Sequence, residues 1–171
     1  MKRLDGRFFD RDVLEVAPEL IGKILVSEIN GEQVRIRISE TEAYRGEEDT
    51  ACHAHKGRTK RTEVLYGISG VIYVYLCYGM HWLMNIVTGN EDEPQAVLLR
   101  AGVGFNGPAK LTKALGVTGE QNRQHIIGNA EIWIEDDGKE YSYHTDTRVG
   151  IGYATEEYRE KQWRFILDES D

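Results

Sequence analysis

The sequence contains few cysteines and no long apolar segment, and each absence excludes a class of protein. The two cysteines, Cys52 and Cys77, cannot build the disulfide framework of a small secreted domain, which favours a reducing environment. No apolar stretch follows the basic N-terminus as it would in a signal peptide. The longest apolar run, around residues 71–78, is too short to cross a bilayer. We therefore expect a soluble, intracellular protein that is not secreted and has no membrane contact.

Positive charge is outnumbered by negative charge. The 171 residues include 21 lysines and arginines against 29 aspartates and glutamates, for a net charge of −8. This balance argues against a nucleic-acid partner, because phosphate contacts need lysine and arginine. The basic residues nevertheless gather in one segment, HKGRTKR at 55–61. A locally positive surface is therefore compatible with an acidic chain.

Motifs for common cofactors and nucleophiles are missing. The sequence has no P-loop, no dinucleotide fingerprint and no nucleophile elbow. The segment CHAH offers Cys52, His53 and His55 as possible metal ligands, but no second cluster with ligand spacing follows. We therefore expect neither a metal nor a cofactor, with a metal site at CHAH as the alternative.

Alternation of apolar and polar residues predicts a sheet of mostly antiparallel strands. One hairpin is expected over 23–44 with its turn at Asn30-Gly31, and a second over 70–89 with its turn at 79–80. Four further strands are expected, at 95–101, 130–135, 147–154 and 162–167.

Two helices are expected beside this sheet. The first follows Asp10, as N-cap, and stops at Gly22, and the second is GPAKLTKALG at 107–116. The predicted fold is a single α+β domain over residues 1–171. It has a curved, mostly antiparallel sheet, flanking short helices and a protruding β-hairpin.

Glu42 occupies an unusual position in the first hairpin. Counted in twos from Val34, the apolar face of the strand continues into Glu40, Glu42 and Tyr44. Burying a carboxylate is costly unless it is paired or used. Glu42 is either a structural partner of an arginine, for which Arg100 at the end of another apolar strand is the candidate, or a general acid or base with a raised pKa.

The second hairpin combines an aliphatic face with an aromatic one. In VIYVYLCYGMHW, Ile72 and Val74 alternate with Tyr73 and Tyr75. Tyr78 and Met80 fall at the tip, where large side chains suit insertion between stacked bases. The alternative for these aromatic residues is packing on a neighbouring strand.

Five segments together resemble the alkyladenine (3-methyladenine) DNA glycosylase family. They occur in family order between residues 8 and 165, and they are ETEAYRGEEDTACH, GVIYVYLCYGMHWLMNI, VLLRA, GPAKLTKALG and RVGIG. One departure is a short linker, GVGFN at 102–106, where the family often has a longer insertion.

The resemblance implies a role for each matched position. Glu42 corresponds to the general base that activates water, and Arg100 and the backbone carbonyl of Val149 correspond to groups that hold that water. Four positions correspond to the pocket for the flipped base: Tyr44, His53, Tyr75 and Asn85. Tyr78, with Met80 beside it, corresponds to the residue that fills the gap in the helix. Four basic residues are candidates for phosphate contacts: Lys56, Arg58, Lys60 and Arg61.

The implied function is base-excision repair. Such an enzyme flips an alkylated or deaminated purine out of duplex DNA and hydrolyses its N-glycosidic bond. No lysine stands at a matched pocket position, so we expect a monofunctional glycosylase that leaves an abasic site. Its partner would be double-stranded DNA with damaged purines, and we expect a monomer located in the cytoplasm at the nucleoid, or in the nucleus. Two other functions stay open: a metal-dependent hydrolase or nuclease that uses Cys52, His53 and His55, and a non-enzymatic nucleic-acid-binding module.

Overall fold

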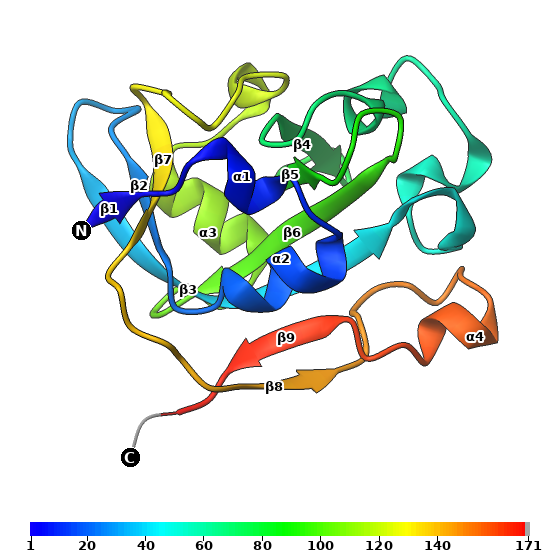
Figure 1. The fold of residues 1–171 in the computed structure, drawn as a ribbon. Coiled ribbons are helices and arrows are strands. Elements are labelled where there is room, and N and C mark those ends of the chain that lie inside the picture. Colours follow the sequence, from blue (N-terminus) through cyan, green and yellow to red (C-terminus); the bar gives the residue numbers. More distant parts are fainter. Residues whose placement is uncertain (170–171) are drawn as a thin grey trace.

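One antiparallel sheet runs through the molecule. The computed structural model describes residues 1–169, so the last two residues of the predicted 1–171 domain lie outside the described part. Within it, nine strands form a sheet in the order β1-β7-β2-β3-β6-β5-β4, while β9 pairs with β3 and β8 with β9 (Figure 1). Short helices lie beside the sheet, which confirms the α+β class. No helix within residues 1–169 has the length and apolar character needed to cross a membrane.

Strands, helices and 3-10 turns are interspersed along the chain. The strands are β1 (Lys2–Arg3), β2 (Ile24–Ser27), β3 (Val34–Arg45), β4 (Ile72–Cys77), β5 (His81–Thr88), β6 (Gln95–Gly102), β7 (Ile132–Asp136), β8 (Tyr143–Asp146) and β9 (Arg164–Leu167). The helices are α1 (Gly6–Phe9), α2 (Val13–Glu19), α3 (Pro108–Leu115) and α4 (Glu156–Arg159). Short 3-10 turns are η1 (Gly46–Glu48), η2 (His53–Lys56), η3 (Thr62–Tyr66) and η4 (Gly119–Gln121).

Both predicted hairpins are present. Strands β2 and β3 pair antiparallel, and Asn30-Gly31 lies within the connection between them, where the Gly31 amide closes a turn on Glu28. Strands β4 and β5 pair from Ile72↔Ile86 to Cys77↔His81. The predicted strands at 95–101, 130–135 and 162–167 correspond to β6, β7 and β9.

The N-terminal helix differs from the prediction at its start. Asp12, not Asp10, caps α2, and its side chain accepts a hydrogen bond from the Leu14 amide. Asp10 instead ends the short helix α1, which is not among the predicted elements. Asp10 and Asp12 are only two positions apart, and either can serve as an N-cap, so the apolar spacing that follows does not decide between them. Helix α3 follows the prediction, since it ends at Gly116 in the left-handed conformation with φ of 80°.

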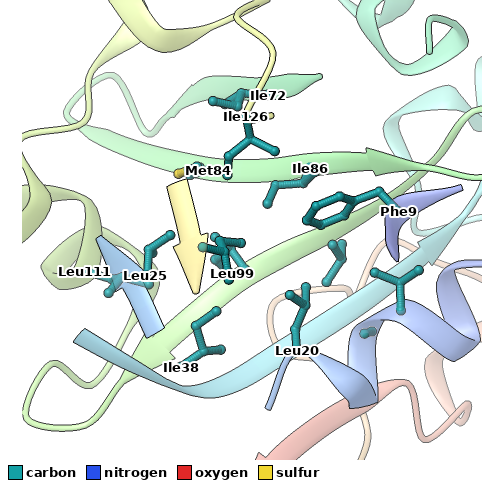
Figure 2. Close-up of a cluster of buried hydrophobic side chains, with 14 of the residues drawn as sticks. Phe9, Leu20, Leu25, Ile38, Ile72, Met84, Ile86, Leu99, Leu111 and Ile126 are labelled. Carbon is teal, nitrogen blue, oxygen red and sulfur yellow. The ribbon is translucent and has the colours of Figure 1, made fainter. Parts of the chain in front are cut away.

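The two faces of the sheet bury different sets of side chains. Helices α1, α2 and α3 cover one face, and their apolar residues pack with Ile72, Met84 and Leu99 from the strands (Figure 2). The opposite face carries Tyr73 and other side chains that pack against the segment containing η2 and η3. Strand β4 therefore supplies aliphatic residues to one side and tyrosines to the other, as its sequence predicted.

A β-bulge in β3 corrects the predicted orientation of Glu42. The pairing of β3 with β6 shifts between Ile38 and Thr41. Ile38 faces the main core, and beyond the shift that core receives Thr41, whose hydroxyl bonds to α2, and Ala43. Glu42 therefore does not continue the apolar face of Ile38 but points to the opposite side of the sheet. An extra residue in a strand reverses which side later residues face, and simple alternation cannot reveal it.

The predicted strand at 147–154 is wrong. This segment is an irregular loop in which Gly150 has a φ of 73°, a left-handed conformation that a strand does not use. Its anchor is Arg148, whose Nη1 and Nη2 bind Asp49 Oδ2 at 2.6 Å and Oδ1 at 3.0 Å. Both side chains are fully buried, and Arg148 also donates to the Ala43 carbonyl oxygen. The loop is held by this ion pair rather than by a strand ladder.

We predict that Asp49→Ala lowers the free energy of unfolding by about 3–5 kcal/mol, because it leaves the buried Arg148 charge without its partner. The matched control is Glu19→Ala, which removes one partner of the exposed ion pair with Arg11 and should cost at most about 1 kcal/mol. Urea unfolding of both variants measures the difference. Equal losses for the two variants would contradict the anchoring role of Asp49.

Candidate active site

Glu42 is the chemically unusual group of the site. Its side chain has no solvent-exposed surface. Each carboxylate oxygen accepts one hydrogen bond: Oε1 from the Tyr44 hydroxyl at 2.9 Å, and Oε2 from the Val149 amide at 2.7 Å. The chain thus supplies two donors, one from the same strand and one from the loop that Arg148 anchors.

Arg100 lies close to Glu42 but is shared with a second carboxylate. Its Nε is 4.0 Å from Glu42 Oε2 and 3.6 Å from Glu40 Oε1. Glu40 is also bound by Arg164, at 2.6 Å. Arg100 lies at the second register shift between β3 and β6: Ala101 pairs with Glu40 and Leu99 with Thr41, so Arg100 itself has no partner in β3. The predicted neighbourhood of Glu42 and Arg100 is therefore present, although their contact is looser than a hydrogen bond.

Burial raises the pKa of the Glu42 carboxyl. The positive charge of Arg100, the Val149 amide and the Tyr44 hydroxyl act in the opposite direction, because they favour the ionised form. A carboxyl with a raised pKa that is held by fixed donors is suited to accept a proton near neutral pH.

A pocket opens on the same side of the sheet as Glu42. It holds about 340 Å³ of empty space, which includes part of the adjoining solvent. All four predicted pocket residues line it: Tyr44, His53, Tyr75 and Asn85. Half of the residues that line the pocket carry aromatic or imidazole rings, which suits the stacking of a flat ring. Glu42 lies behind this lining and reaches it through the Tyr44 hydroxyl.

His53 is held in its neutral form. Burial and the nearby charge of Arg61 lower the pKa of His53 to about 4. Its Nδ1 shares a hydrogen bond of 2.8 Å with the Tyr73 hydroxyl. The centres of the His53 and Tyr75 rings are 4.5 Å apart, and the planes of the two rings meet at 64°. Asn85, which is buried, donates from Nδ2 to the Tyr73 carbonyl oxygen at 3.2 Å. The walls of the pocket are thus fixed by contacts among themselves.

The tip of the β4–β5 hairpin exposes two large side chains. Tyr78 is 92% exposed and Met80 is 69% exposed. Tyr78 has a φ of 52°, an uncommon conformation for a residue with a side chain. Exposed apolar residues held on a tight turn are costly for a soluble surface and indicate a contact surface.

The four basic residues predicted to contact phosphate are exposed but differ in their surroundings. Arg58 is bound to Asp92 at 2.7 Å and lies 4.5 Å from the centre of the Tyr66 ring. The guanidinium of Arg61 lies over the ring of Tyr75, 5.2 Å from its centre, beside the pocket. Lys56 and Lys60 form no ion pair with any of residues 1–169.

The CHAH segment does not gather its side chains around one point. The Cys52 thiol faces the Pro94 carbonyl oxygen, and His55 Nδ1 lies 2.7 Å from the Glu47 carbonyl oxygen. His53 points to Tyr73 instead. In the described part of the chain, no three histidine, cysteine, aspartate or glutamate side chains are placed to share a metal ion. The structure thus gives no geometric support to the metal-site alternative.

Tyr153 and Arg148 are among the site residues that were not identified from the sequence. Tyr153 lines the pocket, and its hydroxyl donates to the Ala51 carbonyl oxygen at 2.7 Å. The guanidinium of Arg148 lies between the rings of Tyr44 and Trp163, at 4.9 and 5.1 Å from their centres. Arg148 begins the RVGIG motif and Tyr153 directly follows it, and this position was the only indication in the sequence that they belong to the site.

Comparison with known proteins identifies the family of this chain. A sequence model of the methylpurine-DNA glycosylase family matches residues 7–105 and 102–171. A protein of Desulfitobacterium hafniense is 43% identical over 99% of this chain and 97% of its own, and one of Natranaerobius thermophilus is 41% identical over 96% and 95%. A protein of Rickettsia felis is 42% identical over 96% of this chain and 92% of its own. All three are provisionally named 3-methyladenine DNA glycosylases. The chain belongs to the methylpurine-DNA glycosylase family.

Proposed function

We propose that this chain is a monofunctional DNA glycosylase that removes alkylated or deaminated purines from duplex DNA. The observation that carries the proposal is a fully buried carboxylate, Glu42, beside an aromatic pocket, with the exposed tip of Tyr78 and Met80 on the hairpin that supplies one pocket wall. Family membership supports the substrate class, because the relatives are named for 3-methyladenine.

Glu42 is the proposed general base. A water oxygen attacks the anomeric carbon of the sugar, and Glu42 takes a proton from that water. The bond between the anomeric carbon and the base nitrogen breaks, and its electron pair leaves with the base. The carboxylate also stabilises the positive charge that develops on the sugar. Arg100 and the Val149 carbonyl are the proposed further contacts of the water, and the Val149 amide, at 2.7 Å from Oε2, fixes its carbonyl near the site.

Tyr44, His53 and Tyr75 are the proposed stacking surfaces for the flipped base. The hydroxyls of Tyr44 and Tyr73 are engaged with Glu42 and His53, so the pocket presents flat, firmly held rings. An alkylated purine that already carries positive charge suits such rings, because aromatic faces attract cations. Asn85, buried and bonded to the Tyr73 carbonyl, is the proposed steric gate against the 2-amino group of guanine.

The reaction is proposed to end with an abasic site. A glycosylase that also cuts the backbone needs an amine nucleophile to form a Schiff base. Among the described residues, those that line the pocket include no lysine. Further proposals are that residues 1–171 act as one glycosylase domain and as a monomer on damaged double-stranded DNA, in the cytoplasm at the nucleoid or in the nucleus. Lys56, Arg58, Lys60 and Arg61 are proposed phosphate contacts.

We predict that Glu42→Gln lowers the single-turnover rate of base release by roughly two to four orders of magnitude, because the amide cannot accept the proton. Binding to a duplex with a single lesion should be retained, since the amide fills the same space. The measurement is release of free base from duplexes carrying 3-methyladenine or hypoxanthine. Glu32→Gln, at an exposed turn, is the matched control and should release base at the wild-type rate. Normal release by Glu42→Gln would refute the mechanism.

We predict that Tyr78→Ala weakens binding of a lesion-containing duplex by about ten- to a hundredfold, the scale of losing one aromatic stacking contact with a base. Excision should fall less when the protein is saturated with DNA, because Tyr78 does not touch Glu42. Tyr143→Ala, which removes a half-exposed tyrosine from β8, is the control. Unchanged duplex binding by Tyr78→Ala would count against insertion of the tip into DNA.

A further inference from the structure

Tyr44 joins the two parts of the site through one side chain. Its ring lines the pocket, and its hydroxyl donates to Glu42 Oε1 at 2.9 Å. Arg148, itself fixed by Asp49, lies 4.9 Å from the centre of the Tyr44 ring. The tyrosine is therefore supported at its ring and engaged at its hydroxyl.

The hydrogen bond from Tyr44 defines the orientation of the carboxylate. The terminal torsion of a glutamate is broad, so a free carboxylate can rotate. Here Oε1 is held by Tyr44, and Oε2 by the Val149 amide at 2.7 Å. Two donors on different oxygens fix the plane of the group and thus the direction of its remaining lone pairs. Without Tyr44, only one of these two constraints would remain.

We propose that Tyr44 is a positioning residue for the reaction. Its hydroxyl orients Glu42 and favours the ionised form of the carboxylate, while its ring serves as a wall for the base. The inference rests on the proposed function, since it assigns a role in activating water through Glu42. It goes beyond a stacking role for Tyr44, because the hydroxyl and the ring have separate tasks that can be separated by substitution.

Positive charges around Glu42 favour its ionised form, whereas burial disfavours it. Burial raises the pKa of Glu42, while Arg100 from β6 and Arg148 beside Val149 lower it. Glu40 shares Arg100 with Glu42 and is itself paired with Arg164. The remaining titratable groups that face Glu42 are three phenols, of Tyr44, Tyr75 and Tyr153. Burial raises the pKa of each phenol, so all three stay neutral where Glu42 titrates and Tyr44 remains a donor.

The sign of the expected pH effect follows from the direction of the hydrogen bond. A donor to the ionised form lowers the pKa of a carboxyl, so removal of the Tyr44 hydroxyl raises the pKa of Glu42. A hydrogen bond to a charged group corresponds to about one to two pH units. The base works only when ionised, so the acid side of the rate profile should move to higher pH by that amount. The rate deficit should then narrow as the pH rises.

The test is Tyr44→Phe, which keeps the ring and removes the hydroxyl. Single-turnover base release is measured from about pH 5 to pH 9, and the titration of the Glu42 carboxyl is followed by ¹³C NMR, with Glu42→Gln to assign its resonance. The matched control is Tyr66→Phe, which removes a tyrosine hydroxyl from another glutamate, Glu47, at 2.6 Å. Thermal unfolding shows whether each variant is folded.

The expected result is an upward shift of about one to two units in both the rate profile and the Glu42 titration of Tyr44→Phe, with neither shift in Tyr66→Phe. Duplex affinity should stay within about threefold of wild type, because the ring is retained. If wild-type protein releases base but the Glu42 carboxyl of Tyr44→Phe titrates like that of wild type, the positioning role is wrong and the proposed function stands. If wild-type protein releases no damaged base, both proposals fail.

Discussion

Glu42 keeps an ionisable carboxyl at a position that solvent does not reach, and the surrounding chain is arranged to make this possible. A buried charge requires donors and nearby opposite charge. The donors come from Tyr44 on β3 and from the Val149 amide, and the nearby cation is Arg100 on β6. Since Val149 follows the Arg148–Asp49 ion pair, the geometry around Glu42 depends on contacts between segments about a hundred residues apart.

The sheet separates stability from function by its two faces. Helices α1–α3 and the aliphatic side chains on one face build the main core, while the opposite face carries the aromatic pocket and Glu42. The same strands serve both purposes, because neighbouring residues point to opposite sides. The pocket walls therefore stand on a rigid layer, which suits a site that must hold a base and a water in fixed positions.

Features that depend on short sequence patterns were predictable. The two hairpins, α3 and the division of β4 into aliphatic and aromatic faces follow from alternation and turn residues. The bulge near Ser39 was not, because a register shift arises from pairing with a distant strand and reverses the face of Glu42. The loop at 147–154 was mistaken for a strand because its apolar residues alternate, although Arg148 is held by a long-range ion pair. The four predicted pocket residues came from the family resemblance, which could not supply Tyr153 or the hydrogen bond between Tyr44 and Glu42.

The central claim is that Glu42 directs one water molecule at the sugar of a purine held in the aromatic pocket. The most direct test is a crystal structure of Glu42→Gln bound to a duplex with a single alkylated purine. The account predicts a flipped base stacked on Tyr44, Tyr78 in the space it left, and one ordered water between residue 42 and the anomeric carbon. A base that occupies the pocket with its sugar out of reach of residue 42, or with no space for a water between them, would contradict it.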